Sequence, residues 1–193
     1  RRPFSDISNR DYYKESVVGK KALISKLNKV NYDKVASNEN VEVIDGLGSF
    51  IDDHTINIKT DGGDYQMYGE RIFINTGARL FVPGIEGLEI SNRIYSSETL
   101  MDLEEFPESL AILGSGFAAS YAKFGTKVTI IDMGDKILPR EDEDVAQEVF
   151  ESYKSLGVDF IFNAGIDKVE QDEKTVRIEY SVNGKKDEIA TEA

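Results

Sequence analysis

The sequence predicts an α/β fold built on a parallel sheet, and three observations support this prediction. Short apolar runs alternate with helical stretches between residues 110 and 162, which is the pattern of a sheet whose strands are joined by helices. The first of these runs ends at a glycine-rich turn, and the second ends at an acidic residue. With 40% hydrophobic and 31% charged residues among 193, the chain can bury a sizeable core.

The first hundred residues predict a helix followed by short strands. Apolar side chains recur at helical spacing from residue 11 to residue 27. The period then changes to that of strands, with runs at 41–44, 49–51, 55–58 and 65–68. A compact apolar run at 71–74 stops at Asn75-Thr76-Gly77-Ala78, as a buried strand that ends in a tight turn would.

The remaining residues predict the order β-α-β-α-β. A strand at 110–113 stops at Gly114-Ser115-Gly116, a short helix reaches Phe124, and a strand at 128–131 closes at Asp132. A helix at about 141–156 and a strand at 158–162 follow. Right-handed crossovers then give a Rossmann-like parallel sheet in three layers. Runs at 176–180 and 188–190 predict a β-hairpin excursion from it.

Composition excludes several classes of function. The 23 basic and 36 acidic residues leave a net charge of −13, which opposes nucleic-acid binding. No stretch approaches a membrane span, and no secretory signal is visible, so a cytoplasmic protein is expected. The absence of cysteine excludes disulfides and thiol chemistry within this chain, and no metal site is expected. Both ends look cut, which predicts a fragment.

The glycine turn and the acid that follows the next strand predict a dinucleotide site. Gly114 lets the chain turn sharply out of its strand, and Gly116 lets a pyrophosphate approach the amides of the following helix. Asp132 can accept hydrogen bonds from the two hydroxyls of an adenine ribose and repels a 2′-phosphate, so NADH is favoured over NADPH. The alternatives are a structural glycine turn and a solvated acid at a strand end.

The helix between Gly116 and Gly125 is unexpectedly short. Residues 117–124 give about 12 Å of helix at about 1.5 Å per residue, whereas a strand of five residues is about 17 Å long. One interpretation takes the residues literally as G-x-G-x-x-A, with Ala119 at the close-packing position. The favoured interpretation is that several residues are missing after Phe117, which places Ala119 further along the helix.

The chain contains four motifs in the order Ile72-Phe73-Ile74-Asn75-Thr76-Gly77-Ala78, Pro83-Gly84-Ile85-Glu86-Gly87, Leu110-Ala111-Ile112-Leu113-Gly114-Ser115-Gly116 and Leu138-Pro139-Arg140-Glu141-Asp142. Together these motifs resemble the FAD-dependent pyridine nucleotide-disulfide oxidoreductases. The likeness is greatest to the branch that contains mercuric reductase and hypothiocyanous acid reductase. The family's flavin glycine fingerprint, redox cysteine pair and C-terminal dimerisation domain have no counterpart here.

The resemblance implies two domains and two cofactors. Residues 1–105 would be the later part of an FAD-binding domain, and residues 106–193 an NAD(H)-binding domain that is truncated at its end. The residues implied for FAD are Thr76, Gly77, Ala78, Gly46 and Gly48, and those for NAD are Gly114, Ser115, Gly116, Phe117 and Asp132. From spacing alone, the turn at 76–78 could equally be an ordinary end to a strand.

The function implied by the resemblance is that of a flavoprotein oxidoreductase. It would pass a hydride from NAD(P)H, with NADH favoured, to FAD and on to a disulfide or a similar small-molecule acceptor. The full-length protein would be a homodimer, and this chain alone would be inactive, with no catalytic residue of its own. The alternatives are a non-catalytic NAD(H)-binding module and a cysteine-free flavoprotein of the ferredoxin reductase type.

Overall fold

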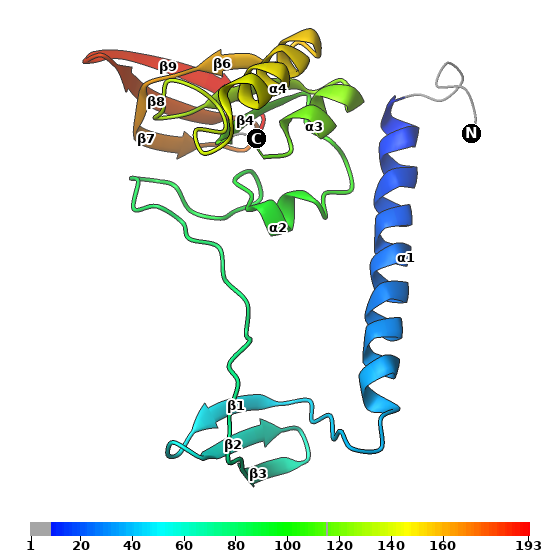
Figure 1. Ribbon diagram of the computed structural model, residues 1–193. Coiled ribbons are helices and arrows are strands. Elements are labelled where there is room, and N and C mark those ends of the chain that lie inside the picture. The colour runs from blue at the N-terminus through cyan, green and yellow to red at the C-terminus, as the bar shows by residue number, and fades with distance from the viewer. Residues whose placement is uncertain (1–8, 115) are drawn as a thin grey trace. The chain divides into compact units, whose positions relative to one another are not determined.

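A computed structural model gives the fold of the protein (Figure 1). The structure describes residues 9–114 and 116–193. They form two compact units, of which the larger contains the residues up to Lys20 together with Leu80–Ala193. The smaller unit is Lys21–Arg79. These compact units do not divide at residue 105, and the cofactor domains expected on either side of that residue stay a prediction.

The larger unit contains the parallel sheet that the sequence predicts. Its strand order is β4-β5-β6, with all neighbours parallel. A short helix, α2 (Ser97–Leu100), precedes the sheet and was not predicted. The α/β fold class is therefore confirmed. The elements of the sheet are β4 (Ser109–Leu113), α3 (Ala118–Phe124), β5 (Lys127–Ile131), α4 (Glu143–Ser155) and β6 (Asp159–Ile161).

The hairpin excursion is larger than predicted. It is a three-stranded antiparallel sheet of β7 (Ala164–Gln171), β8 (Val176–Val182) and β9 (Lys185–Thr191). The sequence predicts only the last two of these strands. The additional strand β7 carries several charged side chains, and a register shift between Ile166 and Lys168 interrupts its alternation. A bulge of this kind hides the period of two on which strand prediction depends.

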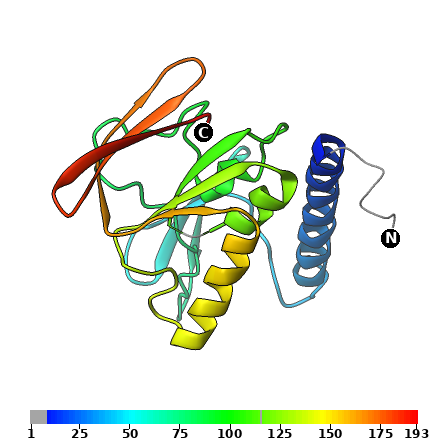
Figure 2. The same cartoon turned by 90° about the horizontal axis from the view of Figure 1, so that it is seen from above.

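The two faces of the parallel sheet are covered by different layers. Alternate side chains of a strand point to opposite faces. Val128 and Ile130 of β5 therefore pack with α3, whereas Ile131 packs with the antiparallel sheet. Figure 2 shows the orange and red strands on one side of the parallel sheet and the helices α3 and α4 on the other. The larger unit thus has the three layers that were expected.

The smaller unit contains an antiparallel meander in the order β1-β2-β3. Its strands are β1 (Leu47–Phe50), β2 (Thr55–Thr60) and β3 (Gly63–Tyr68), all of which the sequence predicts. The helix α1 (Asn9–Ala36) is longer than predicted, and its residues are shared between the two units.

Two predicted strands of the smaller unit are wrong. Residues 41–44 and 71–74 have no regular structure. Phe73 is 88% exposed and Ile74 is 72% exposed, so this apolar run is not buried. Apolar patterning indicates a strand only if a neighbouring strand supplies hydrogen bonds, and none of the sheets in the described residues includes either run.

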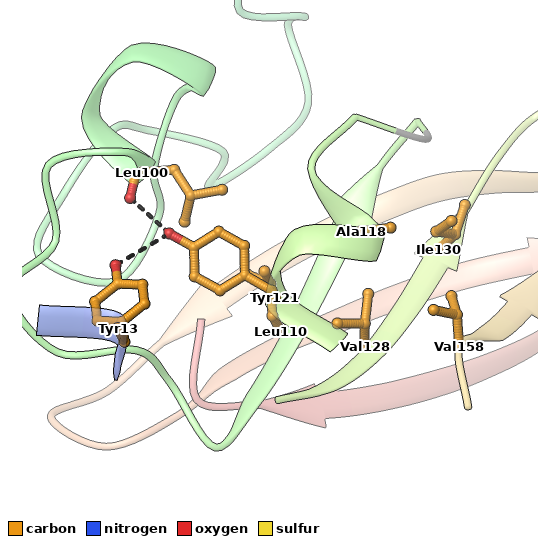
Figure 3. Packing of buried hydrophobic residues seen from close by; sticks show 8 residues of the cluster. All are labelled: Tyr13, Leu100, Leu110, Ala118, Tyr121, Val128, Ile130 and Val158. Carbon is orange, nitrogen blue, oxygen red and sulfur yellow. Dashed lines mark hydrogen bonds between the residues drawn. The ribbon is translucent and has the colours of Figure 1, made fainter. Parts of the chain in front are cut away.

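Two tyrosines hold the first turns of α1 against the rest of the larger unit, to which those turns belong (Figure 3). Both rings are buried. The Tyr121 hydroxyl donates to the carbonyl oxygen of Leu100 at 2.7 Å, and the Tyr13 hydroxyl donates to that of Leu103 at 3.0 Å. The two hydroxyl oxygens are 3.4 Å apart. Burial raises the pKa of Tyr121 well above its usual range, and the neighbouring Tyr13 hydroxyl adds to this effect.

This buried phenol predicts a loss of stability at alkaline pH. Above about pH 10 the unfolded chain loses the Tyr121 proton and the folded chain keeps it, so stability falls by up to about 1.4 kcal/mol per pH unit. Tyr121→Phe is expected to flatten this slope, which denaturant titrations between pH 8 and pH 11 would measure. Tyr65→Phe, at an exposed tyrosine, is the control. Equal slopes in the wild type and Tyr121→Phe would contradict the assignment.

Candidate functional site

The glycine turn at the end of β4 begins in a conformation that favours glycine. Gly114 has a φ of 94°, which residues with a side chain rarely adopt. Its amide donates to the carbonyl of Ile131 at 3.1 Å, which continues the ladder between β4 and β5. Gly116 is exposed, and a Cβ atom there would meet no described atom within 4 Å. The space beside Gly116 is therefore open to a ligand. Ser115 lies outside the described residues.

The crossover that follows closes without additional residues. Phe117 caps the first turn of α3 and is joined directly to Ala118, although it has the left-handed φ of 62°. Gly125, with a φ of 99°, ends the helix. Since left-handed residues turn the chain at both ends, seven helical residues are enough to connect the parallel strands. The residues present are thus enough for the crossover, and the expectation that residues are missing after Phe117 stays a prediction.

The literal interpretation of the motif needs a correction. It places Ala119 where the helix packs closely on the strands. In the structure Ala118 is completely buried against Val128 and Ile130, whereas Ala119 is only partly buried. The early start of α3 moves the close-packing position back by one residue.

Asp132 follows β5 directly and lies beside the glycine turn. Leu113 pairs with Ile131 in register, so Gly114 and Asp132 come next at the same end of adjacent parallel strands. The Asp132 amide donates to the Ile161 carbonyl at 3.0 Å, and the Asp132 carbonyl accepts from the Ala164 amide at 3.0 Å. The carboxylate is half-buried, and its Oδ1 accepts a hydrogen bond from the Gly134 amide at 2.8 Å.

This end of the sheet fits the polar groups of a dinucleotide. No side chain caps α3, and the amides of Ala118 and Ala119 donate to no partner among the described residues. Free amides at a helix N-terminus are donors for a phosphate, and Gly116 leaves them accessible. The Asp132 carboxylate is an acceptor for ribose hydroxyls. The structure thus brings together four of the residues that the sequence assigns to NAD: Gly114, Gly116, Phe117 and Asp132.

The residues assigned to FAD lie in the smaller unit. Thr76, Gly77 and Ala78 are exposed and irregular. Gly46 has a packing role, because a Cβ atom there would come within 2.6 Å of Ile58 Cγ2. At Gly48 the corresponding distance, to Ile56 Cγ2, is 3.4 Å. Their roles toward FAD stay predictions.

An apolar cavity of about 360 Å³ adjoins the glycine turn, and the sequence did not predict it. Gly116 and Phe117 form part of its wall, and Ile112 of β4 and Ile178 of β8 form other parts. Arg93 and Ser96 contribute polar groups. The cavity lies between the two apolar clusters of the larger unit, so its walls come from segments far apart in sequence and no local pattern could have indicated it.

Neither a metal cluster nor a membrane-spanning helix is found in the described part of the chain. Within residues 9–114 and 116–193, no three His, Asp or Glu side chains are placed to hold a metal ion. No helix in those residues is both long and apolar enough to cross a bilayer.

Comparison with known sequences identifies relatives along almost the whole chain. Residues 5–193 match the family described as pyridine nucleotide-disulphide oxidoreductase. The chain is 35% identical over 178 residues to the probable pyridine nucleotide-disulfide oxidoreductase RclA of Escherichia coli, covering 90% of this chain and 40% of that protein. It is 31% identical over 169 residues to dihydrolipoyl dehydrogenase 2 of Haloarcula marismortui, covering 83% of this chain and 35% of that protein.

Solved structures of the same family also match this chain. A Cu(II) complex of the HOCl-induced flavoprotein disulfide reductase RclA from Escherichia coli superposes with a TM-score of 0.84 at 33% identity. The match covers 96% of this chain and 43% of the RclA chain, so this chain spans less than half the length of these relatives. The family match over residues 5–193 includes the glycine turn, Asp132 and both sheets of the larger unit. The chain therefore belongs to the pyridine nucleotide-disulphide oxidoreductase family.

Proposed function

We propose that the larger unit binds NADH as part of a flavoprotein oxidoreductase. The observation that carries this proposal is the position of Gly114, Gly116 and Asp132 at one end of the parallel sheet. Ligands of such sheets bind at the carboxyl ends of the strands. The family and its relatives, which include a flavoprotein disulfide reductase, support FAD and NAD as the cofactors.

Each residue of the site has a distinct task in this proposal. Gly114 turns the chain, and Gly116 keeps the first amides of α3 accessible to the pyrophosphate. Asp132 holds the adenine ribose and disfavours a 2′-phosphate. When bound, the nucleotide would supply a hydride to the flavin, and the electron pair would then pass to a disulfide or similar small molecule, which would take up protons from water. This chain's residues bind and orient the nucleotide.

The proposal also assigns residues to FAD and describes the complete protein. Thr76, Gly77 and Ala78 would approach the flavin nucleotide, and Gly46 and Gly48 would lie near its adenine. The complete protein would be a cytoplasmic homodimer, and the 193 residues alone would not turn over substrate. The domain boundary would lie near residue 105.

A second candidate is an NAD(H)-binding module without catalysis, which is favoured by the absence of cysteine from the sequence. A module would bind NADH and leave it unoxidised when FAD and a disulfide are supplied. The oxidoreductase, completed by its other domains, would oxidise NADH, which absorbance at 340 nm would follow.

Asp132→Asn is expected to weaken NADH binding by about tenfold to a hundredfold, because hydrogen bonds to a charged group contribute about 1.5–3 kcal/mol. NADPH binding should change less, since its 2′-phosphate no longer meets a negative charge. Isothermal titration calorimetry with both nucleotides measures the two affinities. Asp135→Asn, at an exposed acid three residues away, is the matched control. An unchanged preference for NADH in Asp132→Asn would contradict the role of Asp132.

A further inference from the structure

We infer that Gly134 is a positioning residue that fixes the Asp132 carboxylate and so sets the preference for an unphosphorylated ribose. This inference rests on the proposed NADH site. It concerns a residue that no motif in the sequence singles out. It is argued from the hydrogen bonds around the turn after β5 and from the space beside Gly134.

The first argument is that the side chain of Asp132 is held by a single donor. The backbone of Asp132 is fixed on both sides by its hydrogen bonds to Ile161 and Ala164. Only the side-chain torsions remain free, and the Gly134 amide restrains them through its 2.8 Å hydrogen bond to Oδ1. Among the described residues, no other group donates to this carboxylate. The orientation of the carboxylate therefore depends on Gly134.

The second argument is that Gly134 is itself anchored. Its carbonyl accepts a hydrogen bond from the Asn163 amide at 2.8 Å. Asn163 follows the end of β6 and has a φ of 54°, a left-handed conformation that asparagine tolerates better than most residues. Two consecutive hydrogen bonds thus connect the Asp132 carboxylate to the end of β6. A donor that is fixed in this way orients its acceptor without further loss of entropy when ligand binds.

The third argument is that the position favours glycine for a reason of space. A Cβ atom at residue 134 would lie 3.2 Å from Asp132 Oδ1 and 3.5 Å from the Lys136 carbonyl oxygen. The first distance is shorter than an ordinary van der Waals contact, so the carboxylate would have to move by a few tenths of an ångström. Gly134 does not have a left-handed φ. Alanine there therefore acts through this contact and not through backbone strain.

A fixed carboxylate distinguishes the two nucleotides by chemistry. The 2′- and 3′-hydroxyls of NADH both donate hydrogen bonds, and an ionised carboxylate offers about four acceptor sites, of which the Gly134 amide uses one. The 2′-phosphate of NADPH offers acceptors and negative charge in place of a donor. Displacing the carboxylate therefore weakens the interaction with NADH and leaves that with NADPH almost unaffected.

The test compares two glycine-to-alanine variants in the larger unit by calorimetry. Gly134→Ala is expected to weaken NADH binding by about three- to tenfold, the loss of one ordinary hydrogen bond's contribution, with NADPH affinity unchanged. Gly165→Ala is the matched control, since Gly165 is exposed, has no left-handed φ, and a Cβ atom there would meet nothing within 4 Å. This control is expected to bind NADH as the wild type does.

A double variant separates positioning from a general structural effect. If Gly134 acts through the carboxylate, then Gly134→Ala added to Asp132→Asn costs less NADH affinity than it does alone. Fully additive losses would overturn the inference. So would NADH binding that falls in Asp132→Asn but is equal in Gly134→Ala and Gly165→Ala. Absence of NADH binding by the wild type would instead overturn the proposed function and the inference together.

Discussion

Gly87→Ala is expected to lower the free energy of unfolding by at least about 4 kcal/mol, a loss reserved for substitutions that force atoms to overlap or strain the backbone. A Cβ atom at this position would lie 1.9 Å from the carbonyl oxygen of Val169. Gly87 also has a φ of 76°, which alanine adopts at a cost. Neither side can move away, because the Val169 amide donates to the neighbouring Glu86 carbonyl at 2.8 Å.

Urea unfolding followed by far-UV circular dichroism measures this loss. The matched control is Gly84→Ala in the same segment. Gly84 is exposed, has no left-handed φ, and a Cβ atom there would meet nothing within 4 Å. This control should keep the wild-type stability to within about 0.5 kcal/mol. Equal unfolding midpoints for the two variants would show that the segment does not lie against β7 as described.

The sequence indicates that residues 83–87 form an irregular crossing, but not what they touch. The glycines at 84 and 87 look alike in the sequence, and both fit a turn. Only the bridge between Glu86 and Lys168, which joins residues about eighty positions apart, makes Gly87 indispensable. A local sequence pattern indicates the backbone conformation that its residues prefer. It does not indicate contacts between residues that lie so far apart in the chain.

The parallel sheet was predictable because other layers cover both of its faces. The strands of such a sheet are continuous apolar runs, and β4 and β5 have this form. Residues 71–74 have the same form and are nevertheless exposed and irregular. The pattern reports a preference for burial and cannot report whether a neighbouring strand is present. The error at 71–74 and the success at β4 and β5 therefore have the same origin.

The candidate site was predictable to the extent that it depends on sequence order. A glycine turn after one strand and an acid after the next must meet if the strands are adjacent and parallel, and Gly114 and Asp132 do so. The burial of Ala118 and the hydrogen bond from Gly134 depend on where α3 begins and how the chain turns after β5. The first of these details follows from the left-handed conformation of Phe117, and the second from the turn at Gly134, neither of which the sequence reveals.

Ile130→Ala is expected to lower the free energy of unfolding by about 2–5 kcal/mol, from lost transfer energy and the cavity left behind. Ile130 is completely buried in the central strand and packs with Ala118 and Val128. Ile130→Val should cost only about 0.5–1.5 kcal/mol. Urea unfolding of both variants gives the graded series, and Lys127→Ala, at an exposed position of the same strand, is the control.

The same series tests whether the core supports the candidate site. Ile130 lies two residues before Asp132 and on the face of β5 that packs with α3, so a cavity there loosens the contact between helix and strand. We expect NADH affinity in Ile130→Ala to fall at temperatures where the variant is still folded, while Ile130→Val keeps it. A loss of stability without any loss of affinity would mean that the glycine turn and Asp132 are held by the backbone hydrogen bonds of the sheet alone.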